Sequence, residues 1–212
     1  MKSDVFVGVD VGGTRKGFHA IAIRERTITG QLHTLVAEEV AEWCNQCEAI
    51  GVGIDAPCRW SRTGHARAAE HELAKLGISA FATPTRALAE SRTFYSWMLN
   101  GARLYVLVER GFPLFSGREP DSRFCVETFP QAVVCALAGR VLPAKEKRIN
   151  RPAVLVAEGL DTSPLTSVDF VDAALCALTA HYVARGTYKA YGDETDGFIV
   201  VPSFSSNFEL NA

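Results

Sequence analysis

The sequence lacks the features that define several large classes of protein. None of its apolar runs approaches the ~20 residues of a membrane helix, and residues 1–4 lead into an apolar strand rather than a signal peptide. There is no internal repeat and no low-complexity segment. The formal net charge is -2, so no global basic field indicates a nucleic-acid partner. We therefore expect a cytoplasmic protein without membrane contact, which would bind any nucleic acid through local basic patches.

The sequence is also poor in ligands for soft metals and in nucleotide-binding motifs. Most of its six cysteines lie in apolar surroundings, which predicts reduced, buried thiols. Only Cys44 and Cys47 have the spacing of zinc ligands, and no second pair completes a tetrahedral site. No second glycine-rich motif for adenosine and no aromatic-and-basic motif for single-stranded nucleic acid stands out. A zinc site is therefore not expected.

The sequence does contain enough apolar material for one sizeable core. With 212 residues, 48% hydrophobic and 22% charged, its composition is typical of a globular domain. The order of the expected elements predicts an α/β mixed sheet in a single domain spanning residues 1–212, with a helical insertion at about 60–115. Apolar periodicity predicts strands at 5–10, 16–23, 30–36, 50–55, 124–127 and 197–202, and helices at 38–48, 61–76, 86–109, 130–142 and 169–185.

Five carboxylates occupy positions where an acid needs a special reason. Asp10, Asp55 and Glu127 each end a short apolar strand, and Asp169 and Asp172 open the last helix. An acid at the end of a buried strand requires a cation, a proton or a capped backbone. Because such a sheet gathers its strand ends, Asp10 and Asp55 should be adjacent. Each acid alone also has a structural explanation, as a turn cap, a surface acid or an N-cap.

Five motifs in a fixed order carry a resemblance to a known family. They are GVDVGG, GIDAP, ETFP, DFVDAALCALTA and DGFIVVP. Over almost the whole chain they resemble the family of uncharacterised proteins described as predicted ribonuclease H-like nucleases. The resemblance implies a ribonuclease H-like fold, in which a three-strand antiparallel meander is followed by parallel strands, with helices on both faces. It also implies that Asp10, Asp55, Glu127 and Asp172 form a catalytic metal centre. The last helix, with Asp169 and Asp172, is similar to the last catalytic helix of Holliday-junction resolvases.

Phosphodiester hydrolysis gives such an acid cluster a chemical reason. Two divalent ions ~4 Å apart require several hard oxygen ligands in a small space. Without metal, the same acids would repel one another and raise each other's pKa values. The sequence therefore predicts a nuclease with a two-metal centre of Mg²⁺ or Mn²⁺. The expected metal ligands are Asp10, Asp55, Glu127, Asp169 and Asp172, and Asp169 is also expected to be the N-cap of its helix.

Positive charge beside the acids would hold a phosphate-bearing substrate. For the basic run at 139–151, a solvated helix end is the competing explanation. The expected partner is nucleic acid, although nothing in the sequence separates DNA, RNA and a small phosphorylated molecule or sets the oligomeric state. The expected substrate-binding residues are Gly12, Gly13, Lys16, Arg59, Arg62, Arg67, Lys147, Arg148 and Arg151.

Two other functions fit parts of the sequence. Residues 8–17 are similar to the first phosphate-binding hairpin of actin-like sugar kinases, whose glycines let backbone N–H groups approach phosphates. Such a phosphotransferase or nucleotide-binding protein typically needs two copies of this core, whereas 212 residues hold one plus helical insertions. The other alternative is a non-catalytic protein that binds nucleic acid or a partner. That function predicts dispensable acids, and the sequence retains all of them.

Overall fold

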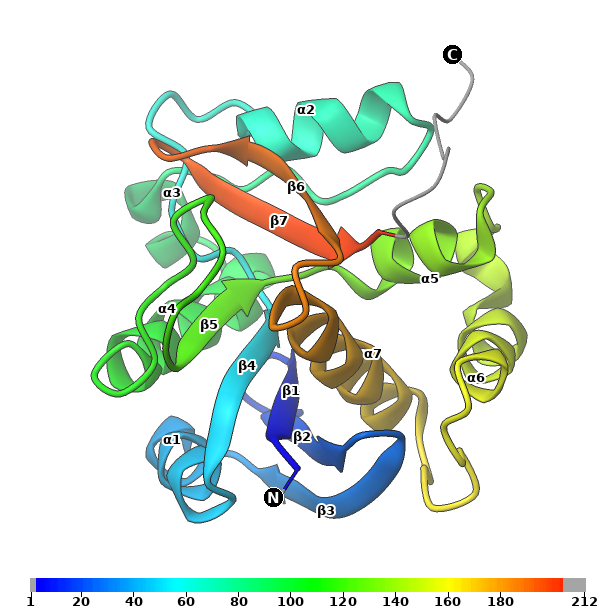
Figure 1. The fold of residues 1–212 in the computed structure, drawn as a ribbon. Coiled ribbons are helices and arrows are strands. Elements are labelled where there is room, and N and C mark those ends of the chain that lie inside the picture. Colours follow the sequence, from blue (N-terminus) through cyan, green and yellow to red (C-terminus); the bar gives the residue numbers. More distant parts are fainter. Residues whose placement is uncertain (1–2, 204–212) are drawn as a thin grey trace.

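A mixed sheet forms the centre of the computed structural model, which describes residues 3–203 (Figure 1). Its strands are β1 (Val5–Val11), β2 (Phe18–Arg24), β3 (Thr27–Thr34), β4 (Ala49–Asp55), β5 (Phe124–Glu127), β6 (Tyr188–Asp193) and β7 (Gly197–Pro202). They lie in the order β3-β2-β1-β4-β5-β7-β6. β1, β2 and β3 form an antiparallel meander, β4, β5 and β7 continue the sheet in parallel, and β6 returns antiparallel at the edge. This arrangement confirms the expected mixed sheet, in which a three-strand antiparallel meander is followed by parallel strands.

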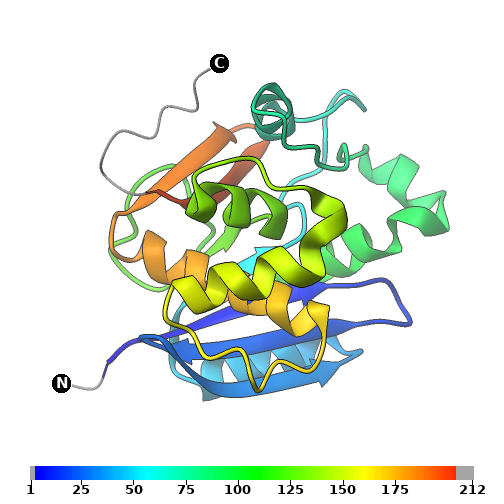
Figure 2. The ribbon, with the colours of Figure 1, turned by 90° about the vertical axis from the view of Figure 1, so that its right-hand side faces the viewer.

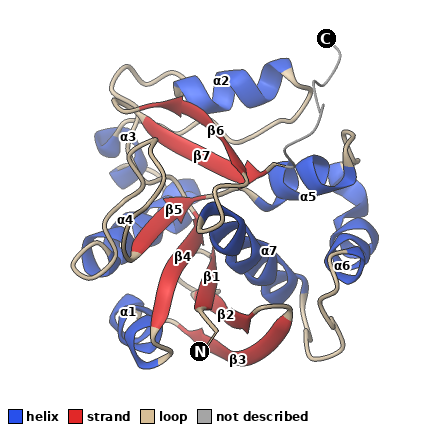
Figure 3. Cartoon of the chain, viewed as in Figure 1, coloured by secondary structure: helices blue, strands red, loops and turns tan. Residues whose placement is uncertain are grey.

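Helices cover both faces of the sheet (Figure 3). The α-helices are α1 (Ala37–Gln46), α2 (Ala68–Lys75), α3 (Arg86–Glu90), α4 (Ser96–Val108), α5 (Pro130–Ala138), α6 (Lys147–Ala157) and α7 (Val168–Val183), with short 3-10 turns at Thr93–Tyr95 and Ala144–Glu146. Figure 2 shows α5, α6 and α7 together in front of the sheet. α1 and α4 pack on the opposite face, and α2 lies along β6. No helix in the described range is long and apolar enough to cross a membrane.

The middle of the chain departs from the expected helices. The helix expected at 61–76 is shortened to α2, because Gly64 has a φ of 82° and the Ser61 hydroxyl binds the backbone at Gly64 and His65. The helix expected at 86–109 is divided into α3, a 3-10 turn and α4, since Arg92 between them is extended. The sequence pattern does not predict β6 or α6. α6 contains Pro152, a residue that usually ends helices.

Alternation along β1 decides which way Asp10 points. Val5, Val7 and Val9 face the core shared with α1 and α4, so Gly8 and Asp10 face α7. A Cβ atom on Gly8 would lie 1.9 Å from the Ala173 carbonyl oxygen, which shows that α7 rests directly on the backbone of β1. The glycine therefore permits the close packing that brings the start of α7 against the end of β1.

The same rule positions Asp55 on the neighbouring strand. A Cβ atom on Gly53 would lie 2.2 Å from the Cys176 carbonyl oxygen, so Gly53 also faces α7. Asp55 lies two residues further along β4 and shares that face. β1 and β4 pair in parallel with Asp10 opposite Asp55. The adjacency expected for these two acids is therefore present, next to the first turns of α7.

The N-cap of α7 is Ser167, and the expectation that Asp169 caps the helix is wrong. The Ser167 hydroxyl accepts the Phe170 N–H at 3.3 Å, and Asp169 lies within the first helical turn. A side chain already inside the helix cannot act as its N-cap. The carboxylate of Asp169 instead reaches away from the helix to the ammonium of Lys16, at 2.8 Å.

Candidate metal centre

A cavity of about 470 Å³ opens where β1, β4 and β5 end and α7 begins. Its wall combines acids from the strand ends, from α2 and from α7 with cations from three places. These cations come from the turn between β1 and β2, which contains Gly12 and Gly13 and is called the glycine turn below, from α6 and from the loop before α2. The charged residues that line it are Asp10, Lys16, Asp55, Arg67, Glu70, Glu127, Lys147, Arg151 and Asp172. Four of the five expected metal ligands thus lie on one cavity, and Asp169 reaches it through Lys16.

Asp10 lies at the centre of this acid cluster. Its carboxylate is buried and accepts a bond from the Lys16 ammonium at 3.0 Å. Burial raises the pKa of Asp10 to about 6, and the negative charges of Asp172 and Asp169 add to this while Lys16 opposes it. A further cation beside Asp10 would therefore strongly stabilise its ionised carboxylate.

The Asp55 carboxylate has neither a hydrogen bond nor an ion pair within residues 3–203. Its side chain lines the cavity. Burial raises the pKa of Asp55 well above its usual range, and the charges of Asp10 and Asp172 raise it further. Asp172 differs because it forms an ion pair with Arg151, but burial still raises its pKa. Among these acids, Asp55 is therefore the one whose ionised form a bound cation would stabilise most.

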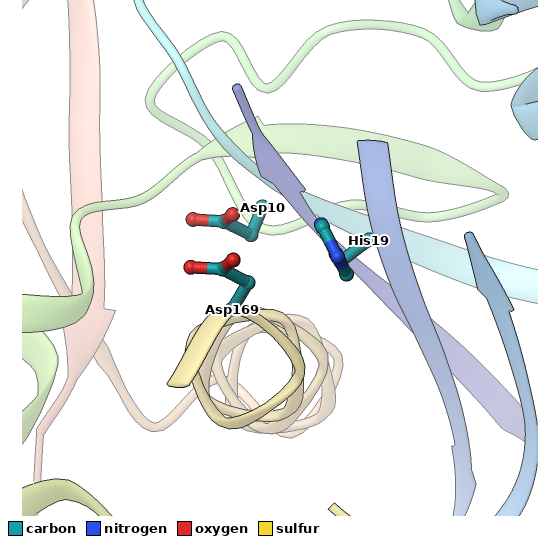
Figure 4. Close-up of side chains that lie close together, drawn as sticks. All are labelled: Asp10, His19 and Asp169. Carbon is teal, nitrogen blue, oxygen red and sulfur yellow. The ribbon is translucent and has the colours of Figure 1, made fainter. Parts of the chain in front are cut away.

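Asp169 and His19 complete a second group around Asp10. One ligand atom from each of the three residues lies within 4.8 Å of the others. Figure 4 shows the Asp10 and Asp169 carboxylates side by side, with the His19 ring beside them. His19 is buried, its Nδ1 has no hydrogen bond, and burial lowers its pKa, so the ring is neutral at pH 7. A neutral imidazole is a metal ligand.

His19 is a site residue that the sequence analysis did not single out. The signal was present in the hairpin, because a turn between β1 and β2 places His19 directly opposite Asp10 in the antiparallel register. Residues paired in this way point to the same face of the sheet. Counting back from the glycine turn would therefore have identified His19 as a neighbour of Asp10.

Glu127 lines the cavity but faces away from α7. Along β5, Phe124 and Val126 face the α7 side, so Glu127 points to the opposite face. Its carboxylate receives two bonds from the Arg67 guanidinium, at 2.5 and 2.9 Å, and one from the Cys58 N–H at 2.7 Å. The expected role of Glu127 as a metal ligand stays a prediction, and it would require release from Arg67.

The expected substrate-binding cations differ in their surroundings. Lys16, Arg67, Lys147 and Arg151 line the cavity. Arg67 is only 1% exposed, because Glu127 and Glu70 bind its guanidinium. Arg59 pairs with Glu109 at 3.2 Å, and Arg62 and Arg148 are exposed without lining the cavity. Lys147 is thus the cavity-lining cation that remains exposed and without a pairing carboxylate among the described residues.

Side chains of the protein occupy the space beside the two glycines of the glycine turn. A Cβ atom on Gly12 would lie 2.6 to 2.7 Å from three carbons of the Lys16 side chain, which folds back over the turn. A Cβ atom on Gly13 would lie 2.8 Å from the Ser96 hydroxyl. Both glycines therefore provide room for neighbouring side chains.

Exposed aromatic rings form one rim of the cavity. Phe81 and Trp97 line it, and their ring centroids are 6.4 Å apart. Phe94 contacts Phe81 edge to face at 5.8 Å. Phe81 is 65% exposed and Phe94 58% exposed, which is unusual for such large apolar side chains. Phe81 lies in the loop before α3, whereas Phe94 and Trp97 are three residues apart across the start of α4, so no single sequence motif predicts this aromatic rim.

Comparisons with known proteins cover the same residues. A family model described as "Protein of unknown function (DUF429)" matches residues 8–196, a range that contains every acid of the cluster. No curated protein matches the chain. The "Thermus thermophilus RuvC structure" is 19% identical with a TM-score of 0.46, covering 86% of this chain and 97% of that chain. "T. thermophilus RuvC in complex with Holliday junction substrate" is 20% identical with a TM-score of 0.47, covering 87% and 97%.

Proposed function

Because the chain belongs to the family described as "Protein of unknown function (DUF429)", a description that names no activity, we propose from the chemistry of the site that the protein is a divalent-metal-dependent nuclease. The observation that carries the proposal is the unpaired Asp55 carboxylate, which lines the same cavity as Asp10 and Asp172. A cation is the group that relieves such a site.

The donor set fits a divalent ion with oxygen ligands. Among the described residues, the four carboxylates of Asp10, Asp55, Asp169 and Asp172 have two paired cations between them, Lys16 and Arg151. When all four acids are ionised, as they would be around a bound cation, two negative charges are left over, which equals the charge of one Mg²⁺ or Mn²⁺ ion. Carboxylate oxygens are the ligands that these hard ions prefer. The candidate ligands for that ion are Asp10, Asp55 and Asp172, with Asp169 held by Lys16.

The surrounding residues suit a phosphodiester. A bound divalent ion would supply an activated water and neutralise charge on the phosphoryl oxygens. Arg151 orients Asp172 through their ion pair. Lys147 offers an exposed ammonium to a backbone phosphate, and the aromatic rim offers ring faces to unpaired bases. Together these groups favour a nucleic acid with single-stranded character.

The phosphotransferase alternative gains little from the geometry. Its central requirement is open space over the glycines, so that backbone N–H groups can approach a phosphate. Gly12 is instead covered by the stem of Lys16, and Gly13 lies against Ser96. The turn between β1 and β2 therefore does not leave these glycines open to a phosphate.

Asp172→Asn tests the proposal directly. Wild type should hydrolyse labelled oligonucleotides in Mn²⁺ and gain melting temperature from the ion, whereas D172N should lose both, with at least a hundredfold slower hydrolysis. The fold should survive, because Arg151 still lies near the negative charge of Asp55. A matched control is Asp161→Asn, which changes an exposed acid whose carboxylate accepts two bonds from Ser163 and lies outside the cavity. If D172N keeps the wild-type gain in Tm, Asp172 is not a ligand; if wild type shows no gain, the metal centre itself is rejected.

The aromatic rim predicts a preference among substrates. Phe81→Ala should weaken binding of single-stranded oligonucleotides about 5- to 150-fold, since stacking contributes ~1–3 kcal/mol per base. Binding of blunt duplex should change far less, because its bases are already stacked. Fluorescence anisotropy at one fixed salt concentration measures both. The control is Val106→Ala, which removes another exposed apolar side chain away from the cavity. Equal losses for single strand and duplex would contradict a stacking role.

A further inference from the structure

The acids around Asp10 define two positions for a cation. Asp10 and Asp55, which are paired across β1 and β4, line the cavity together with Asp172 and define the first, which we name the Asp55 position. Asp10, His19 and Asp169 define the second, which we name the His19 position, and their ligand atoms lie within 4.8 Å of one another (Figure 4). Asp10 belongs to both. Two positions that share one carboxylate are the arrangement that a pair of ions requires.

The His19 position already has a cation of the chain's own. The Lys16 ammonium lies 3.0 Å from the Asp10 carboxylate and 2.8 Å from that of Asp169. A monovalent ammonium that bridges two carboxylates provides the electrostatic neutralisation that an ion would provide there. At the Asp55 position, Lys16 contacts Asp10 and Arg151 contacts Asp172, but among the described residues no cation bridges either acid to the Asp55 carboxylate.

The turn between β1 and β2 is built to deliver this ammonium. Gly12 leaves the space across which the Lys16 stem folds back. The Gly12 N–H bonds the Gly17 carbonyl at 2.7 Å, and the Lys16 N–H bonds the Gly13 carbonyl at 2.9 Å, which closes the turn tightly. Asn100 of α4 donates to the Gly12 carbonyl at 2.9 Å and fixes the turn against the neighbouring helix. Lys16 is therefore held by its backbone, although its side chain is 43% exposed.

We propose that Lys16 is a tethered replacement for the second metal ion, so that the centre binds one divalent ion, at the Asp55 position. The proposal rests on the function proposed above and revises the two-ion centre expected from the sequence. The proposal also implies that His19 could coordinate a metal ion at the His19 position, but that the Lys16 ammonium prevents an ion from binding there. The charge balance agrees, because two paired cations leave the four acids with the charge of one divalent ion.

Counting bound Mn²⁺ by electron paramagnetic resonance tests this proposal without any activity assay. Wild type should bind one Mn²⁺ per chain. Lys16→Met keeps the length of the stem and removes the ammonium, so it should bind two ions, whose spins couple at a spacing of ~4 Å. The ion gained should show nitrogen coupling from His19. Lys16→Arg, which retains a cation, and Arg15→Met, which removes an exposed charge from the same turn, should both stay at one ion.

The possible results separate this proposal from the proposed function. Two ions in wild type would overturn the role of Lys16 and leave the metal-dependent nuclease intact. One ion in both wild type and K16M would also overturn it, since the His19 position would then not be a metal site. No bound ion in either protein would reject the metal centre and the role of Lys16 together. Two ions in R15M would show that general charge, rather than the Lys16 ammonium, limits the count, and would overturn the proposal.

Discussion

Asp55→Asn should make the metal-free protein more stable at pH 7 and remove its stabilisation by Mn²⁺. Asp55 is an unpaired carboxylate beside two other acids, and an amide of the same shape removes the repulsion without disturbing packing. The expected gain is about 1–3 kcal/mol, or roughly 2–4 °C in Tm for each kcal/mol. At a hundredfold excess of Mn²⁺ over Kd, wild type should gain about 2.7 kcal/mol and D55N nothing.

The gain from D55N should depend on pH with a definite sign. Burial and the neighbouring acids raise the pKa of Asp55 in the folded protein above its value in the unfolded chain. Between the two values the folded state holds more protons, so wild type loses stability as the pH rises through the folded-state pKa. Well below pH 4 the side chain is neutral in both states, and near pH 4 the stability of D55N should differ little from that of wild type. The advantage of D55N should then grow toward pH 7.

Thermal unfolding in a chelator between pH 4 and pH 8 measures this difference. Asp161→Asn provides the control, because Asp161 is exposed and lies outside the cavity. A gain of equal size at pH 4 and pH 7 would mean that the amide acts through packing rather than charge. A full Mn²⁺ increment in D55N would remove Asp55 from the proposed ligands.

The sequence predicts the strand framework because each core strand is a local signal. Residues 5–10 and 50–55 are continuous apolar runs bounded by turns, and both strands form within a residue of their expected limits. Asp10 and Asp55 inherit their adjacency from the pairing of these two strands. These apolar runs do not reveal which face of the sheet each side chain points to, because a fully buried strand shows no alternation of polar and apolar residues. For this reason Glu127 is expected beside Asp10 and Asp55, although β5 turns it to the other side of the sheet.

The remaining site features depend on contacts between distant segments. The partner of Asp172 is Arg151 on α6, a helix that the sequence pattern does not predict. The aromatic rim joins Phe81 in a loop to Phe94 and Trp97. Local patterns carry no information about such pairs. By contrast, the sequence allows Ser167 to be predicted as the N-cap, since Ser and Asp cap helices about equally well. The choice between Ser167 and Asp169 depends on the residue at which the helix begins.

Arg67→Met should destabilise the protein by about 3–5 kcal/mol, because it leaves two buried carboxylates without their cation. Arg67 is 1% exposed, and Glu70 and Glu127 are each 4% exposed. The guanidinium bonds Glu70 at 2.9 Å and Glu127 twice, and it also donates to the Asp196 carbonyl at 3.2 Å. The Tm should fall by roughly 6–20 °C for a chain of this length.

The sequence predicts a different role for Arg67, that of binding the substrate phosphate. The R67M variant distinguishes this role from structural pairing with the two buried carboxylates. Arg62→Met is the matched control, since Arg62 is an exposed arginine from the same loop and its loss should change stability by only about 0.5 kcal/mol or less. Adding Glu127→Gln to R67M should restore part of the lost stability, because it removes one of the two stranded charges. If R67M melts like R62M but binds oligonucleotides more weakly, Arg67 is a substrate contact. A large fall in Tm, partly rescued by E127Q, identifies it instead as the cation that joins the loop before α2 to the end of β5 and so supports one wall of the cavity.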